Sequence, residues 1–215
     1  MITNYKHIIW DWNGTLLDDV SECLAVLNEL LRRRELPLLT EEQYRARFDF
    51  PVIDFYIGMG FDFEKESFDD IAHEYHAGYV RKVPECRLQP DARQVLRAFD
   101  EAGLSQSLLS AYQRERLKEA VTHFNLDVHF TKLIGMNDYY AHSKVENGMR
   151  WVNELFYEPG EILFVGDTCH DYEVAQAMGT DCILVTFGHQ NRDQLSPCGV
   201  PLLDSLAEIQ QYVLS

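Results

Sequence analysis

Short apolar runs recur along the chain and predict the strands of a sheet. Five such runs are bounded by glycine or polar residues, near residues 7–11, 105–110, 130–135, 161–166 and 181–186. Between the later runs, apolar positions recur with helical spacing over residues 90–102, 113–124, 144–157 and 170–178. Strands that alternate with helices across short connections predict an α/β fold, with a doubly wound, mainly parallel, five-stranded Rossmann-like sheet covered on both faces.

The first connection breaks this alternation. From Asp18 to about Pro84 the chain is helical in pattern and rich in charge, as in SECLAVLNELLRRREL and FEKESFDDIAHEYHAGYVRKV. No internal repeat and no low-complexity linker interrupts it. The pattern therefore predicts a core domain made of residues 1–17 and 85–215, with a helical domain over residues 18–84 inserted after the first strand.

Composition narrows the possible partners and compartment. The chain has 215 residues, 46% of them apolar, which suffices for a substantial core. A formal net charge of −16 argues against binding to nucleic acid. Five widely spaced cysteines, with no signal-peptide pattern and no apolar stretch of membrane-spanning length, favour the reducing cytoplasm and no membrane partner. The sequence carries no indication of oligomeric state.

Carboxylates follow two of the predicted strands. In IIWDWNGTLLDD, residues 8–19, Asp11 ends an apolar run, and Asn13 would project to the same side of an extended chain. In ILFVGDTCHDY, Asp167 ends a second run and Asp171 begins a helix, while Ser110 ends a third run. Each of these residues taken alone is also a common turn former or helix N-terminal acid. Taken together they predict a site at the carboxyl edge of the sheet, where clustered carboxylates need a cation such as Mg²⁺.

The same residues resemble the motifs of the haloacid dehalogenase-like (HAD) hydrolases. DWNGTLLDD is similar to the first motif of that family, D-x-D-G-T-L-x-D, and VGDTCHD is similar to the fourth, G-D-x-x-x-D. SLLS, ending at Ser110, and Lys144 in SKVENG resemble the second and third motifs. The four stand in the family's order, and the insert between the first two resembles the helical cap of the phosphoglycolate phosphatase-like branch.

This resemblance implies a role for each position. Asp11 would be the nucleophile that carries an aspartyl-phosphate. Ser110 would hydrogen-bond a phosphoryl oxygen, and Lys144 would offset negative charge. Mg²⁺ would be held by Asp11, the backbone carbonyl of Asn13, and Asp167. Asp171 would support the ion directly or through water. The implied activity is a Mg²⁺-dependent phosphatase acting on a small phosphorylated metabolite, similar to phosphoglycolate phosphatase.

Asn13 departs from the family pattern. The family has an aspartate there, which protonates the leaving group and later activates water. An amide cannot act as a general acid or base, and such help is worth about 10²–10⁴-fold in rate. We therefore expect low or selective activity, with aryl or acyl phosphates preferred over alkyl phosphates, and faster alkyl-phosphate turnover in Asn13→Asp.

The sequence is also compatible with two other functions. One is a phosphotransferase with a long-lived aspartyl-phosphate, and the other is a phosphate-ligand binder without turnover. The substrate would be set by the insert, where cationic side chains are candidate partners for a substrate carboxylate and two histidines are candidate proton donors: Arg45, Arg47, Arg81, Lys82, His73 and His76. A charged, solvated helix face and ordinary structural histidines account for these residues more simply.

Overall fold

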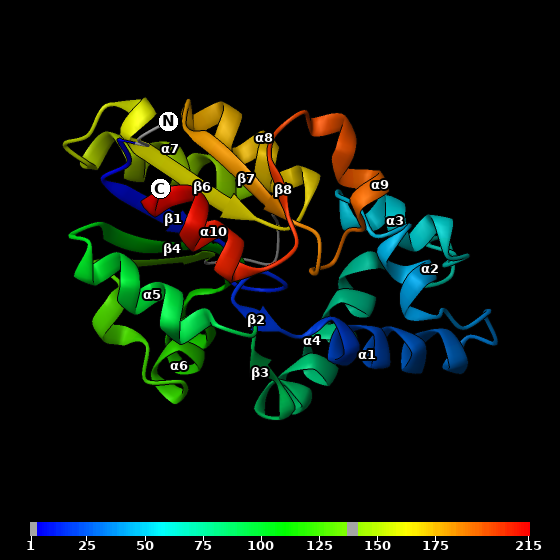
Figure 1. Ribbon diagram of the computed structural model, residues 1–215. Coiled ribbons are helices and arrows are strands. Elements are labelled where there is room, and N and C mark those ends of the chain that lie inside the picture. The colour runs from blue at the N-terminus through cyan, green and yellow to red at the C-terminus, as the bar shows by residue number, and fades with distance from the viewer. Residues whose placement is uncertain (1–3, 137–141) are drawn as a thin grey trace.

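A parallel sheet forms the centre of the molecule (Figure 1). The computed structural model describes residues 4–136 and 142–215. The six strands run in the order β5-β4-β1-β6-β7-β8, and every neighbouring pair is parallel. Their bounds are His7–Trp10 (β1), Ser105–Gln113 (β4), Lys132–Met136 (β5), Ile162–Gly166 (β6), Asp181–Val185 (β7) and Leu202–Leu203 (β8).

Helices cover both faces of this sheet, which confirms the doubly wound α/β fold. The helices are α5 (Ala92–Glu101), α6 (Arg114–His123), α7 (His142–Glu154), α8 (Cys169–Met178), the short α9 (Arg192–Leu195) and α10 (Leu206–Leu214). Four single turns of 3₁₀ helix join elements, at Val83–Glu85, Asp127–His129, Pro159–Glu161 and Ser196–Cys198. None of the helices in the described parts of the chain is long and apolar enough to cross a bilayer.

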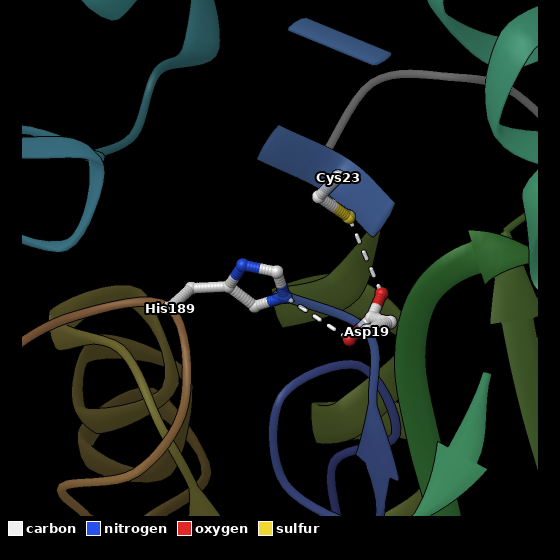
Figure 2. A group of neighbouring side chains, drawn as sticks. All are labelled: Asp19, Cys23 and His189. Carbon is white, nitrogen blue, oxygen red and sulfur yellow. Dashed lines mark hydrogen bonds and ion pairs between the residues drawn. The ribbon is translucent and has the colours of Figure 1, made fainter. Parts of the chain in front are cut away.

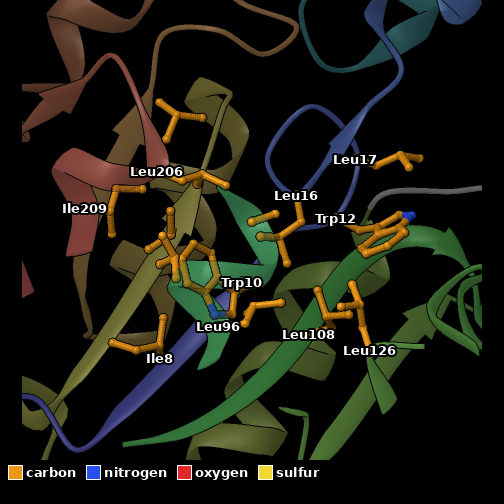
Figure 3. Close-up of a cluster of buried hydrophobic side chains, with 14 of the residues drawn as sticks. Ile8, Trp10, Trp12, Leu16, Leu17, Leu96, Leu108, Leu126, Leu206 and Ile209 are labelled. Atoms are coloured by element: carbon orange, nitrogen blue, oxygen red, sulfur yellow. The ribbon is translucent and has the colours of Figure 1, made fainter. Parts of the chain in front are cut away.

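Alternate side chains of β1 enter two different cores. Ile8 and Trp10 pack with residues of α5, α6 and α10 on one face of the sheet, where Leu96 and Ile209 lie close to them (Figure 3). Ile9 packs on the other face with residues of α7 and α8. A strand buried on both faces carries a continuous apolar run, which is why this segment is visible in the sequence.

Two details of the sheet differ from the expectation. A sixth strand, β8, extends the five that were predicted, because two residues are too few to give an apolar run. The strand predicted over residues 105–110 continues as β4 to Gln113, and its register with β5 shifts between Leu109 and Gln113. Ser110 therefore lies at an irregularity within the strand, just after its last regular pair, instead of at its end.

The charged first connection folds into four helices beside the sheet, to its right in Figure 1. These are α1 (Val20–Arg33), α2 (Glu41–Arg45), α3 (Val52–Gly58) and α4 (Phe68–Lys82). They share an apolar cluster of their own, in which Leu27, Phe55 and Ile71 are buried. A two-stranded antiparallel ribbon, β2 (Leu17–Asp18) with β3 (Arg87–Leu88), joins both ends of the insert to the rest of the chain. The division into domains at residues 17/18 and 84/85 stays a prediction; β2 lies across the first boundary, and β3 begins just after the second.

Candidate active site

Asp11 follows β1 directly and is held at the centre of the carboxyl edge of the sheet. Its backbone N–H donates to the carbonyl of Val165 on the neighbouring strand β6, at 2.8 Å. The residue is only 5% exposed. The buried strand thus delivers a carboxylate to a fixed place with little access to water.

Asp167 and Asp171 come from the junction of β6 and α8. Thr168 is the N-cap of α8, and its hydroxyl forms a capping box with Asp171. One carboxylate oxygen of Asp171, Oδ2, accepts the backbone N–H groups of Asp167 and Thr168 at 3.1 and 3.0 Å. Asp171 therefore fixes the start of the helix, and its other oxygen faces the site.

Gly14 allows the loop after β1 to approach Asp167. Its φ of +73° is rarely adopted by other residues, and a Cβ there would lie 2.2 Å from Asp167 Oδ2. The hydroxyl of Thr15 donates to Oδ1 of Asp167 at 3.2 Å, and the backbone N–H of His189 donates to Oδ2 at 2.6 Å. These contacts hold Asp167 in one orientation beside Asp11.

Lys144 on α7 reaches into the carboxylates from the opposite side. Its ammonium lies 2.6 Å from Oδ1 of Asp11 and 2.6 Å from Oδ1 of Asp171. The side chain is buried, at 3% exposure. Burial alone would lower the pKa of the lysine, but the two carboxylates raise it above its ordinary value, so the ammonium stays charged.

The three carboxylates carry more negative charge than Lys144 offsets. One oxygen from each of Asp11, Asp167 and Asp171 lies within 4.8 Å of the others. Burial raises the pKa of Asp11 above its ordinary value, and the charges of Asp171 and Asp167 raise it further against the opposing effect of Lys144. Buried, hard oxygen donors in such a cluster fit a cation of the Mg²⁺ type.

Ser110 and Asn13 complete the set of sequence-predicted residues. Ser110 is buried, and its Oγ accepts the backbone N–H of Tyr112 at 3.1 Å. One cavity of about 550 Å³ is lined by all six candidates, Asp11, Asn13, Ser110, Lys144, Asp167 and Asp171. The structure thus brings these residues together, whereas their roles stay predictions. The five residues before α7, residues 137–141, lie outside the described part of the chain.

The side chain of Asn13 belongs to a tight polar triangle. Its Nδ2 donates to Oδ2 of Asp19 at 2.7 Å and to the hydroxyl of Tyr79 at 2.6 Å. That hydroxyl in turn donates to the same Asp19 oxygen at 2.6 Å. Since Tyr79 lies on α4, the side-chain amide of Asn13 is bound both to its own loop and to the inserted helices.

Asp19 is a fully buried carboxylate paired with His189 (Figure 2). The imidazole Nε2 lies 3.3 Å from Oδ1 of Asp19, and the thiol of Cys23 donates to Oδ2 at 3.4 Å. Burial acts to raise the pKa of Asp19, but His189 and the hydrogen bonds from Tyr79 and Asn13 lower it to about 2. Burial conversely acts to lower the pKa of His189, and Asp19 raises it to about 9. The pair is therefore an ion pair at neutral pH.

These additional residues are not equally recognisable in the sequence. Asp19 stands inside the quoted DWNGTLLDD segment, but nothing in the pattern distinguished it from Asp18 beside it. Tyr79 and His189 lie 60 or more positions further along the chain, in segments without a recognisable motif. Their connection to Asn13 exists only in the folded chain.

The cationic residues proposed for a substrate carboxylate point elsewhere. Arg45 donates to the carbonyl of Phe187 and pairs with Glu41, and Arg81 donates to Ala77 on its own helix. These side chains do not contribute to the cavity wall, and neither do Arg47 and Lys82. The charged-helix interpretation therefore accounts for them better than carboxylate binding does.

Of the two candidate histidines, only His76 reaches the cavity. Burial lowers its pKa to about 4, with a smaller contribution from His73. A histidine with that pKa is neutral at pH 7, which disfavours a role as the proton donor. His73 is exposed and contacts the carbonyl of Asp69 on the same helix.

Comparison with known proteins identifies the family of this chain. The family model described as haloacid dehalogenase-like hydrolase matches residues 8–185. A phosphoglycolate phosphatase from Vibrio vulnificus (strain YJ016) is 23% identical over 228 residues, covering 97% of this chain and 96% of the relative. The crystal structure of a predicted phosphoglycolate phosphatase from Haemophilus somnus covers 99% of both chains, with a TM-score of 0.75 and 20% identity. CbbY from Rhodobacter sphaeroides, in complex with phosphate, covers 95% of this chain and 96% of its own, with a TM-score of 0.72 and 17% identity.

Proposed function

This chain belongs to the haloacid dehalogenase-like hydrolase family, and from that premise we propose that it is a Mg²⁺-dependent phosphatase acting on a small phosphorylated metabolite. One observation carries the proposal. Asp11 lies buried at the carboxyl edge of the sheet, with Asp167, Asp171 and Lys144 within reach of its carboxylate. The match to a phosphoglycolate phosphatase over nearly the full length of both chains supports the same reaction class.

Asp11 is the proposed nucleophile. One of its carboxylate oxygens attacks phosphorus, the bond from phosphorus to the leaving oxygen breaks, and the phosphoryl group is carried as an aspartyl-phosphate. Water then attacks this phosphorus and restores the carboxylate. Lys144 holds Asp11 in place and offsets charge on the phosphoryl oxygens, and Ser110 donates a hydrogen bond to one of them.

The metal role falls to the acidic cluster. Asp11, Asp167 and the backbone carbonyl of Asn13 are the proposed ligands, and Asp171 supports them by fixing Lys144 and the start of α8. Mg²⁺ would neutralise negative charge on the phosphoryl group as it is transferred. The contacts that Thr15 and His189 make to Asp167 orient that carboxylate for the same purpose.

Asn13 limits which substrates are turned over. Its amide is not acidic enough to protonate a leaving alkoxide, so we propose that hydrolysis depends on leaving groups that depart without protonation. Aryl and acyl phosphates have such leaving groups, whereas simple alkyl phosphates do not.

The test is the variant Asp11→Asn, assayed with p-nitrophenyl phosphate and Mg²⁺. It should lose at least about 10³-fold in turnover, because the amide cannot form the phosphoryl bond, and it should no longer bind beryllium fluoride, which mimics the phosphoryl group. Asp193→Asn, at an exposed position on α9, is the matched control and should keep wild-type activity.

Circular dichroism of both variants establishes that each one is folded. Undiminished activity in Asp11→Asn would rule out the covalent mechanism. Beryllium fluoride binding to the wild type without turnover of any phosphate ester would favour a phosphate-ligand binder instead.

A further inference from the structure

The cavity above Asp11 is walled largely by aromatic rings of the inserted helices. Its volume of about 550 Å³ lies within the range of pockets that enclose ligands much larger than a two-carbon acid. The aromatic residues of its wall come from α2 to α4, the segments between them and β4: Tyr44, Phe48, Phe50, Phe55, Tyr56, Phe68, Tyr75, Tyr79 and Tyr112.

These rings pack against one another as a continuous surface. Phe48 stacks on Tyr44 with centroids 5.3 Å apart, and it meets Phe50 edge-on at 5.4 Å. Phe50 in turn lies 4.8 Å from the ring of His170, at the start of α8 beside the carboxylates. The aromatic wall therefore extends to the phosphate end of the cavity, where a leaving group would lie.

Positive charge on this wall is already paired. Among the described residues that line the cavity, Lys144 is the one lysine or arginine, and its ammonium contacts both Asp11 and Asp171. His189 is paired with Asp19. His170 pairs with Glu173 through Nδ1, and its buried Nε2 has no hydrogen-bond partner among the described residues. The described lining thus offers no unpaired lysine or arginine to a second anionic group on the substrate.

A carboxylate placed here would be taken out of water without a lysine or arginine to pair with, which disfavours binding. An uncharged ring would displace water from apolar surface and could meet the wall rings in edge-to-face or offset-stacked geometry. The chemistry of the wall therefore selects against phosphoglycolate and in favour of an apolar organic group.

We propose that the substrate is a phosphomonoester whose organic part is uncharged and aromatic, bound against the rings of the inserted helices. This inference rests on the proposed phosphatase function and names its substrate class. The amide of Asn13 points the same way by independent chemistry, because an aryl oxide leaves without the proton that Asn13 cannot supply.

The first experiment separates recognition from leaving-group reactivity. Benzyl phosphate and 2-phosphoglycolate both have an alkoxide as the leaving group. The ratio of their kcat/KM values therefore compares binding of a ring with binding of a carboxylate. We expect benzyl phosphate to be favoured at least about 100-fold. Their unreactive counterparts, benzylphosphonate and phosphonoacetate, should inhibit p-nitrophenyl phosphate hydrolysis with the same order of preference.

The second experiment places a cation on the wall. Ala72 on α4 lines the cavity, whereas Ala77 on the same helix is exposed and does not. Ala72→Arg should reduce the preference of benzylphosphonate over phosphonoacetate by about tenfold or more, because the guanidinium partners the carboxylate and displaces the ring. Ala77→Arg should leave the preference unchanged.

The outcomes distinguish this inference from the proposed function. Faster hydrolysis of 2-phosphoglycolate than of benzyl phosphate by the wild type would overturn the aromatic substrate class while leaving the phosphatase intact. Preferential binding of benzylphosphonate with no turnover of any phosphomonoester would support the aromatic site and overturn the phosphatase. If Ala72→Arg is unfolded, the wild-type comparison of the two phosphonates decides the question alone.

Discussion

At the scale of single residues, Asn13 and Asp19 form one unit. The amide Nδ2 of Asn13 lies 2.7 Å from Oδ2 of Asp19, and both groups contact the hydroxyl of Tyr79. Introducing an aspartate at position 13 would place two carboxylates at this distance in a buried site, where like charges cannot both be accommodated. The effect of introducing an acid at position 13 thus depends on the residue at position 19.

We predict that exchanging the two residues restores acid–base help better than a single substitution. Asn13→Asp combined with Asp19→Asn keeps one amide against one carboxylate and should raise turnover of benzyl phosphate by about 10²–10⁴-fold. Asn13→Asp alone should gain less and should lower the Tm by several degrees, on the order expected for an unpaired buried charge. Steady-state kinetics and thermal unfolding at pH 7 measure both effects.

The control for this exchange is Asp19→Asn alone. It removes the partner of His189 without adding an acid, so it should lower stability and leave alkyl-phosphate turnover low. A doubly substituted protein no faster than wild type would show that another group supplies the proton, or that proton supply does not limit the rate.

At the scale of elements, His7 joins β1 to β4. It is fully buried, with Nδ1 2.6 Å from the hydroxyl of Ser105 and Nε2 2.8 Å from that of Ser107. Burial lowers its pKa from 6.5 to about 4. A neutral imidazole suits two hydroxyls, since each hydroxyl can donate or accept, whereas a protonated ring would carry a buried charge between two strands.

The lowered pKa of His7 predicts that this one residue contributes to the loss of stability at acid pH. The folded-state pKa lies below the unfolded value, so the unfolded chain binds more protons as the pH falls. The stabilisation is complete above about pH 6.5 and is lost between there and about pH 4. Between pH 7.5 and 4.5, wild type should lose about 2–3 kcal/mol more unfolding free energy than His7→Gln.

Urea unfolding at the two pH values measures this difference, and other titrating groups cancel because both proteins share them. An NMR titration in which the His7 ring protonates near pH 6.5 in the folded protein would contradict the prediction. Equal losses of stability in the two proteins would contradict it as well.

At the scale of the whole molecule, the acidic cluster connects separate parts of the chain. Asp11 follows β1, Asp167 follows β6, Asp171 begins α8, and Lys144 belongs to α7. A cation bound by these carboxylates requires the folded arrangement of all of them. Metal binding should therefore stabilise the molecule globally.

We predict that Mg²⁺ at about 100 times its dissociation constant adds about 2.7 kcal/mol and raises the Tm by about 5–10 °C. Asp167→Ala should abolish most of this shift and Asp171→Ala should reduce it less, because of these two residues only Asp167 is a proposed direct ligand. Burial holds the pKa of Asp11 above its ordinary value, so Mg²⁺ must displace a proton there. The shift should accordingly grow from pH 6 to pH 8.

Differential scanning calorimetry with Mg²⁺, against Mg²⁺-free, EDTA-treated samples, measures the effect. A Tm shift of the same size in wild type and Asp167→Ala would place the cation elsewhere. A shift that decreases as the pH rises would contradict the proton displacement at Asp11.

The five longer strands of the sheet, and the polar groups that follow them, are predictable from the sequence alone. A strand buried on both faces consists of consecutive apolar residues, such as Ile8, Ile9 and Trp10. The residue that follows the strand lies at the carboxyl edge of the sheet. Asp11 and Asp167 are predictable for this reason, as is the α/β alternation. The period of a strand or helix is local, so a single chain displays it.

The surroundings of those groups depend on contacts that form only in the folded chain. The contact between Asn13 and Tyr79 spans 66 positions, and Asp19 meets His189 across 170. No spacing along the chain encodes such pairs, because they arise where the inserted helices pack against the sheet edge. The aromatic wall has the same origin: its rings read as ordinary core residues in sequence, and folding leaves one face of them lining a cavity beside Asp11. The positions of the candidate catalytic residues therefore follow from local pattern, whereas the cavity wall, on which the proposed substrate class rests, follows from packing between segments far apart in the chain.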